Sequence, residues 1–162
     1  MCLRLASTQQ TLAHALARTG KDRQWWLALA AGPMFWLALV FAGHAVATPP
    51  WPLAQPLAYL HLAVLMPMVE ELLFRGLLQS WMLERSWGAR RRGGISHANL
   101  LTSALFSALH LLHHPPLWAL GVWFPSLLFG YFRERHASVL PGMLLHIVYN
   151  AGYFWWFFRP PA

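Results

Sequence analysis

Long stretches without any charged residue constrain this chain more than any other feature of its sequence. Residues 24–69, 93–132 and 136–158 contain no Asp, Glu, Lys or Arg, and only 10% of the chain is charged. An average soluble domain carries about 25% charged residues, whereas a helix that crosses a bilayer needs about 20 mostly apolar residues. The charge-free stretches therefore predict an integral membrane protein, and a length of 162 residues suits a single domain.

Prolines and glycines divide these stretches into shorter segments, because proline removes a backbone donor and glycine loosens the chain. The breaks fall at 49–56, 88–94 and 115–116. We expect one intramembrane domain at 24–158, preceded by a cytoplasmic N-terminal segment, 1–23, and followed by a short C-terminal tail, 159–162. The pattern predicts an all-α, polytopic membrane helical bundle of about five transmembrane helices, at 24–46, 57–83, 97–112, 117–132 and 139–158.

The basic residues predict an orientation, because short cytoplasmic loops of membrane proteins are enriched in Lys and Arg. With the N-terminus inside and five spans, only Arg159 lies outside the cell and only Arg75 lies within the membrane. Every other basic residue is then cytoplasmic: Arg4, Arg18, Lys21, Arg23, Arg85, Arg90, Arg91, Arg92, Arg133 and Arg135.

The net charge of +7 is explained by this topology, so we expect the lipid bilayer and not nucleic acid as a partner. The apolar run after the basic N-terminal segment exceeds the 7–15-residue core of a typical signal peptide. We therefore expect a retained membrane anchor. Cys2 is the one cysteine of the chain, which excludes an internal disulfide.

The stretch "PMVEELLFRG", residues 67–76, introduces charge into an otherwise apolar segment. A charge near the bilayer centre costs at least about 2.5–3.5 kcal/mol, so these side chains need partners or a function. Glu71 and Arg75 are four residues apart and can pair across one helical turn. Glu70 is five residues from Arg75, so it stays available for chemistry. The alternative is that both glutamates line a helix–helix contact.

Two further predicted helices carry polar residues at the same spacing. "FSALH" places Phe106 and His110 on one helical face, and "HIVYN" does the same for His146 and Asn150. A rise of about 1.5 Å per residue is consistent with Glu70, His110, His146 and Asn150 lying in one layer. Several imidazoles, a carboxamide and an unpaired carboxylate on three helices are not explained by helix packing alone.

The order EExxxR, FxxxH, HxxxN resembles the CAAX protease and bacteriocin-processing (CPBP) family of glutamate intramembrane proteases, over residues of about 65–150. The approach "RHASVLPGMLLHIVYN" also resembles the last motif of that family. The resemblance implies a metal-independent endopeptidase without cofactors, in which Glu70 and His110 activate water. It further implies that His146 and Asn150 stabilise the oxyanion, with Glu71, Arg75 and Phe106 in supporting roles.

The chain is shorter than the eukaryotic prenyl-protein proteases of this family and resembles its short bacterial members more closely. The resemblance therefore implies a membrane-anchored protein or peptide substrate, such as a C-terminal sorting signal, cut near the membrane surface. It also implies a location in the bacterial inner (cytoplasmic) membrane.

Three other readings remain open at the level of sequence. The first is a zinc-dependent membrane protease that uses His110, His146 and Glu70, since zinc accepts His and carboxylate ligands, although no HExxH motif occurs. The second is a non-enzymatic immunity or scaffold protein. The third is a proton-coupled transporter, which would also bury a glutamate but would be expected to show an inverted repeat.

Overall fold

The chain folds into a bundle of helices. The computed structural model describes residues 13–44 and 51–158. Cys2, the first two residues of the proline break (Pro49 and Pro50) and the predicted tail 159–162 therefore lie outside the described residues. Residues 13–20 are helical and lead into the bundle. The main helices are α2 (Arg23–Phe41), a continuous long helix from Pro56 to Leu83, α6 (His97–His110), α7 (Pro116–His136) and α8 (Leu140–Trp156).

The long helix is built from five consecutive pieces without a break. A short 3-10 turn, η1 (Trp51–Leu53), precedes it, and Pro56 begins it at the first helical position, where the missing N–H of proline is tolerated. Two of the pieces are π-helical and therefore have wider turns than an α-helix. The pieces are α3 (Pro56–Leu60), η2 (His61–Leu65), α4 (Met66–Glu71), η3 (Leu72–Gln79) and α5 (Ser80–Leu83).

Helices lie at all five positions expected from the sequence, with different ends. α2 ends at Phe41, short of the predicted 46, and α7 continues to His136, beyond the predicted 132. The predicted end of this helix, residue 132, lies directly before its first charged residue, Arg133. The helix continues because basic side chains in a last turn interact favourably with the carbonyl end of the helix dipole.

The prediction of an all-α fold needs one correction. Two short antiparallel strands, β1 (Arg91–Arg92) and β2 (Ile95–Ser96), form a hairpin between α5 and α6. Gly93 and Gly94 connect them, both with positive φ, 57° and 87°. Two-residue hairpin turns require such angles, which glycine adopts without steric cost. The glycine break expected at this place is thus an ordered turn.

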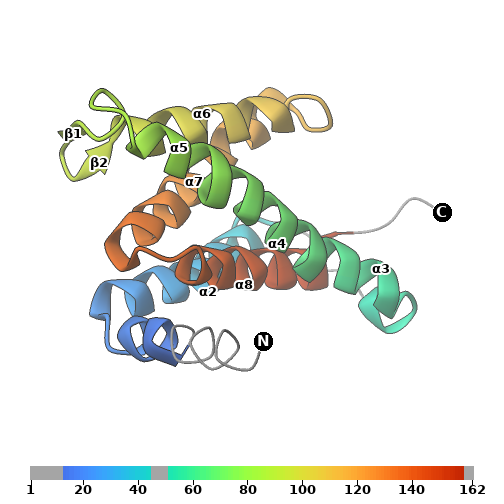
Figure 1. Cartoon of the computed structure of the whole chain (residues 1–162). Coiled ribbons are helices and arrows are strands. Elements are labelled where there is room, and N and C mark those ends of the chain that lie inside the picture. Colours follow the sequence, from blue (N-terminus) through green and yellow to red (C-terminus); the bar gives the residue numbers. More distant parts are fainter. Residues whose placement is uncertain (1–12, 45–50, 159–162) are drawn as a thin grey trace.

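The helices pack against one another in a row from α6 through α7 and α8 to α2. α6 packs on α7, α7 on α8 and α8 on α2, and the long helix contacts both α6 and α8. In Figure 1 the long helix, drawn in green, crosses the bundle diagonally in front of α8 and reaches from the hairpin to the far end of the molecule. The long helix therefore contacts both of the other helices that carry predicted site residues, α6 and α8.

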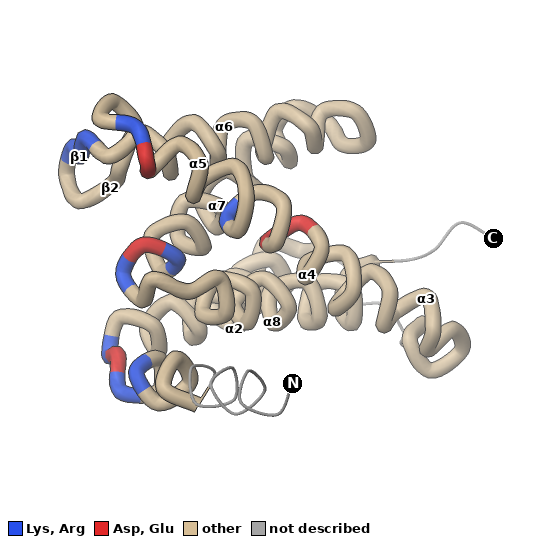
Figure 2. The backbone as a smooth tube through the Cα atoms, in the orientation of Figure 1, with Lys and Arg blue, Asp and Glu red and all other residues tan. Residues whose placement is uncertain are grey.

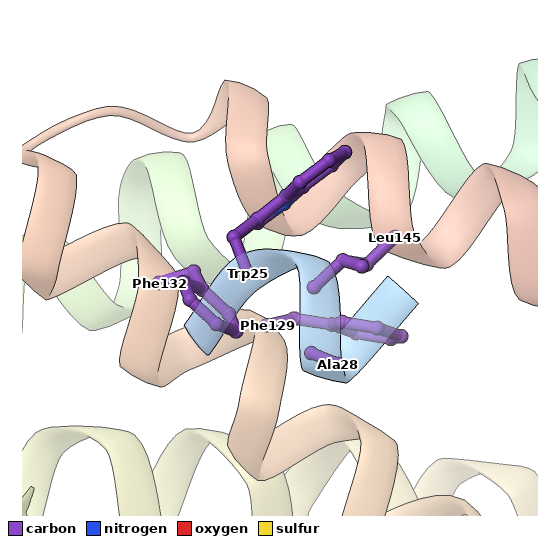
Figure 3. Close-up of a cluster of buried hydrophobic side chains, with 5 residues drawn as sticks. All are labelled: Trp25, Ala28, Phe129, Phe132 and Leu145. Atoms are coloured by element: carbon purple, nitrogen blue, oxygen red, sulfur yellow. The ribbon is translucent and has the colours of Figure 1, made fainter. Parts of the chain in front are cut away.

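A small apolar core lies where α2, α7 and α8 meet. The indole of Trp25 packs there and donates a hydrogen bond to the carbonyl of Pro141 at 3.0 Å. Figure 3 shows the buried members of this cluster: Trp25, Ala28, Phe129, Phe132 and Leu145. The cluster fixes α8 against α7 next to the site described below.

Outside this core the usual distribution of residues is inverted. Leu27 and Phe41 of α2 and Leu57 of α3 are more than 70% exposed, whereas α6 buries Asn99, Ser103 and other polar side chains. A bilayer solvates apolar side chains, so polar ones turn towards neighbouring helices. Two helices, Arg23–Phe41 and Pro56–Leu83, are long and apolar enough to cross a membrane.

Candidate active site

A row of polar side chains runs along the long helix. Glu71, Arg75 and Gln79 follow one another at intervals of four residues, and each is fully buried. Arg75 and Gln79 belong to the π-helical piece η3. Wide turns of this kind are frequent at functional sites. The row faces α7 and α8, whose side chains and carbonyls provide its partners.

Glu71 and Arg75 form the ion pair that their spacing predicts. Nη1 of Arg75 lies 3.1 Å from Oε1 of Glu71. The other guanidinium nitrogen, Nη2, donates to the hydroxyl of Ser126 at 2.7 Å and to its carbonyl at 3.2 Å. The guanidinium also lies over the ring of Phe106, 4.7 Å from its centroid, which is within cation–π range. The buried arginine is thereby held from three sides.

His146 of α8 lies between the two glutamates. Its Nδ1 is 3.0 Å from Oε1 of Glu71, and its Nε2 is 3.6 Å from Oε2 of Glu70. An ionised carboxylate only accepts hydrogen bonds, so Nδ1–H donates to Glu71. The distance to Glu70 is too long for a hydrogen bond. The imidazole is therefore oriented by Glu71 and presents Nε2 towards Glu70.

The ring of Phe129 packs against the face of this imidazole. The two rings stack with centroids 4.7 Å apart and an angle of 17° between their planes. Gly142 of α8 makes this approach possible: a Cβ at that position would lie 2.7 Å from the carbonyl oxygen of Phe129. Because His146 follows Gly142 by one turn, the close contact between α7 and α8 places its ring on Phe129.

Glu70 differs from Glu71 in both exposure and partners. Its side chain is 26% exposed, whereas that of Glu71 is fully buried. Among the described residues, His146 is its one partner in an ion-pair contact. Figure 2 shows an acidic segment on α4, with a basic segment of the same long helix nearby, whereas most of the other basic segments gather at one end of the bundle. Glu70 is thus the accessible carboxylate of the cluster.

His110 joins the cluster through Phe106. The rings of Phe106 and His110 are 4.7 Å apart, and those of Phe106 and His146 are 5.8 Å apart. Nδ1 of His110 is 2.9 Å from the carbonyl oxygen of Phe106. A carbonyl can only accept, so Nδ1–H is the donor, and Nε2 of the neutral ring remains an acceptor. His110 is therefore arranged to accept a hydrogen bond from a small molecule in the site.

The structure brings most of the predicted site residues together. Glu70, Glu71, Arg75 and Phe106 all contact one another or His146. Asn150 lies one turn after His146 on α8 and is half-buried, and within the described residues its side chain makes no hydrogen bond. Across the same residues, no three His, Cys, Asp or Glu side chains converge so that they could hold a metal ion.

Three residues of the cluster were not foreseen. Gln79 donates to the carbonyl of Gly130 at 3.1 Å and to Glu134 at 2.8 Å, and its place four residues after Arg75 was a usable signal. Ser126 and Phe129 carry no such signal, since a serine and a phenylalanine in an apolar helix are ordinary. Their roles depend on how α7 meets the long helix.

Together, the fold and the site define a membrane-embedded helical protein that buries a cluster of carboxylate and imidazole groups. A family model described as type II CAAX prenyl endopeptidase Rce1-like matches residues 51–152, well over half of the chain. The chain belongs to this Rce1-like family, which confirms the resemblance predicted from its motifs. No curated protein matches the chain. No solved structure matches it either. The family suggests a CAAX-type membrane protease.

Proposed function

We propose that this chain is a glutamate-type intramembrane endopeptidase, which hydrolyses a peptide bond near the membrane surface in a membrane-anchored protein. The observation that carries the proposal is the position of His146 between two carboxylates. One of these, Glu71, is neutralised by Arg75 at 3.1 Å, and the other, Glu70, has no arginine or lysine partner among the described residues. A partly exposed carboxylate that no cation neutralises suits a general base.

In the proposed reaction, Glu70 activates the attacking water. The water donates one hydrogen bond to Glu70 and one to Nε2 of His110, which is free to accept because Nδ1–H donates to Phe106. As the water oxygen attacks the peptide carbonyl carbon, its proton moves to Glu70. The carbonyl oxygen becomes an oxyanion, the C–N bond then breaks, and Glu70 returns the proton to the leaving amine.

The developing oxyanion is stabilised from α8. In this proposal His146 donates Nδ1–H to Glu71, and a proton on its Nε2 would be directed towards the reacting centre. The carboxamide of Asn150, one turn further along the same helix, supplies a second donor. Donors that are already oriented before the reaction stabilise an oxyanion without reorganisation. Glu71, Arg75 and Phe129 would act by holding the imidazole in this orientation.

The substrate and its location are also part of the proposal. We infer five transmembrane helices with the N-terminus in the cytoplasm of a bacterium, because the basic residues gather at one end of the bundle (Figure 2) and short cytoplasmic loops are rich in such residues. The exposed apolar side chains of α2 and α3 support contact with lipid. A substrate with a transmembrane or lipid-embedded segment, such as a C-terminal sorting signal, would reach Glu70 from the bilayer.

The proposal is tested with purified protein in detergent and candidate C-terminal transmembrane peptides, whose products are read by mass spectrometry. Glu70→Gln is expected to lower cleavage by at least about 100-fold, the contribution of a general base. His146→Ala is expected to abolish detectable cleavage as well. Glu84→Gln is the matched control, because that side chain is 74% exposed and remote from the cluster, and it should cleave like wild type.

Two results would contradict the proposal. Loss of cleavage with a chelator, restored by zinc, would assign the chemistry to a metal. Equal cleavage by wild type and Glu70→Gln would remove Glu70 from the reaction.

A further inference from the structure

A hollow lies at the end of the bundle where α2 begins and α7 ends. Its volume is about 720 Å³, and it is lined by Arg18, residues 21–24, Arg135 and His136. Four of the lining side chains are basic: Arg18, Lys21, Arg23 and Arg135. Asp22 is the one acidic residue of the lining. None of the residues that line the hollow belongs to the site around Glu70, although Arg135 and His136 begin the stretch "RHASVLPGMLLHIVYN" that resembles the last motif of the family.

Asp22 offsets the charge of Arg135 but not that of the other three basic side chains, because both of its oxygens are already occupied. Oδ2 accepts from Nε of Arg135 at 2.5 Å and lies 2.9 Å from Nε2 of His136. Oδ1 accepts from Nη2 of Arg135 at 3.3 Å and from the backbone N–H of Gln24 at 3.0 Å. The hydrogen bond from Arg135 also lowers the pKa of Asp22 below its ordinary value of 3.8. The carboxylate is a fixed wall of the hollow.

The remaining basic side chains are free to bind an anion. Arg18, Lys21 and Arg23 are exposed, and within the described residues none of them forms an ion pair. They converge on a concave surface, where charges of one sign raise the local concentration of an opposite ion. The partial positive charge at the start of α2 acts in the same direction.

The surface next to the hollow indicates that the anion belongs to a lipid. Trp26 follows directly on α2; its indole is half-exposed and donates its N–H to the carbonyl of Gly20 at 2.8 Å. Tryptophan with one wet and one apolar side is typical of the membrane interface. One residue further, Leu27 is 73% exposed, and Met34 and Phe35 continue this apolar face along α2. A phosphate in the hollow would therefore place acyl chains against α2.

The other basic cluster at this end of the bundle is different. Arg91 of the hairpin pairs with Glu134 at 2.7 Å, and Arg90 and Arg92 are exposed and do not line the hollow. Orientation in the membrane accounts for basic residues of either cluster, but it does not require a cavity. We propose that the hollow formed by Arg18, residues 21–24, Arg135 and His136 binds the headgroup of an anionic phospholipid such as phosphatidylglycerol.

The test compares two double variants of the full-length protein in neutral detergent. Arg18→Gln with Lys21→Gln removes two charges from the hollow, and Arg90→Gln with Arg92→Gln removes two charges from the hairpin. Short-chain phosphatidylglycerol is titrated, and binding is measured by the shift in melting temperature. We expect about 30-fold weaker binding for the hollow variant, since each basic residue near a lipid surface contributes about 5-fold. The hairpin variant should bind within about 2-fold of wild type.

Further ligands separate the lipid from other anions. Glycerol phosphate and inorganic phosphate should bind much more weakly than the lipid, and phosphatidylcholine should not compete. Equal weakening in both double variants would overturn the proposal in favour of diffuse surface charge. Binding of inorganic phosphate as tight as that of the lipid would assign the hollow to a soluble anion. If the hollow variant loses its melting transition, the single variants Lys21→Gln and Arg23→Gln are titrated in its place. Each is then expected to bind phosphatidylglycerol about 5-fold more weakly than wild type.

Discussion

Two places in this molecule combine a carboxylate, an arginine and a histidine, and only one of them has the features of an active site. In the interior, Glu71 contacts Arg75 at 3.1 Å and His146 at 3.0 Å. At the end of the bundle, Asp22 contacts Arg135 at 2.5 Å and His136 at 2.9 Å. The interior ion pair is fully buried, whereas the side chain of Arg135 is 42% exposed. The same three residue types thus occur in two environments.

The two clusters differ in whether a carboxylate is left without an arginine or lysine partner. At the end of the bundle, one carboxylate is shared between an arginine and an imidazole, and the arrangement is complete. In the interior a second carboxylate, Glu70, lies beside the imidazole at 3.6 Å and has no arginine or lysine partner among the described residues. The ion pair alone therefore does not indicate chemistry. The additional carboxylate supports the catalytic role proposed above, because it is costly to keep there without a function.

The largest effect is expected from breaking the interior pair. Glu71→Gln leaves the buried guanidinium of Arg75 without its counter-ion, and removal of one partner from a buried pair costs about 3–5 kcal/mol. Glu70→Gln should leave stability nearly unchanged while removing activity. The measurement is the free energy of unfolding of both variants in mixed detergent micelles. Equal destabilisation by the two substitutions would show that the glutamates share one structural role.

A smaller effect is expected from the contact that sets the imidazole. Gly142→Ala introduces a methyl group 2.7 Å from the carbonyl oxygen of Phe129, and overpacking of this kind costs about 1–3 kcal/mol. α8 must shift. We therefore expect the rate of cleavage to fall by a larger factor than the loss of stability alone would cause. Gly121→Ala on α7 is the control, because nothing lies within 4 Å of its added Cβ. Unchanged cleavage by Gly142→Ala would show that the stacking of His146 on Phe129 does not position the reaction.

Neutralising the carboxylate at the end of the bundle should have less effect than either substitution above. Asp22→Asn removes the charge that faces Arg135, but asparagine is also a favoured helix N-cap, so the bond to the N–H of Gln24 can be kept. The exposed guanidinium of Arg135 can be hydrated instead. Thermal unfolding should show a small decrease in melting temperature. A decrease as large as that of Glu71→Gln would mean that exposure does not distinguish the two clusters.

The smallest effect is a pH dependence of this outer cluster. The hydrogen bond from Arg135 lowers the pKa of Asp22 in the folded state below its ordinary value of 3.8. A depressed carboxyl pKa stabilises the fold fully above the unfolded value, and this stabilisation is lost as the pH falls through the folded value. The stability difference between wild type and Asp22→Asn should therefore be constant near neutral pH and should shrink below about pH 3.8. A difference that grows on acidification would contradict the assignment.

The sequence was informative wherever the answer depended on neighbours along one helix. The charge-free stretches predicted where the helices lie, and the four-residue interval between Glu71 and Arg75 predicted their ion pair. Both are local properties, which the helical repeat determines. The C-terminal end of α7 and the strands β1 and β2 were missed, because the positions of charged residues do not show which structure the chain forms outside the apolar layer.

The arrangement between helices could not be predicted in the same way. Glu70 and Glu71 point in different directions from the helix, yet both approach His146, because the two nitrogens of one imidazole lie between them. Ser126 and Phe129 enter the cluster only through the crossing of α7 with the long helix and α8. That crossing depends on the absence of a side chain at Gly142, whose significance appears only when the opposing backbone is known.

The π-helical piece Leu72–Gln79 restricts how many residues this part of the long helix can contain. In a regular α-helix with 3.6 residues per turn, side chains at intervals of four drift slowly around the axis. Wider turns contain more residues and oppose this drift, so Glu71, Arg75 and Gln79 can all face the same neighbours and remain fully buried. Deletion of one residue here would favour ordinary turns and rotate Gln79 away from Gly130. The spacing of this helix, as well as its side chains, is therefore a property that any variant must preserve.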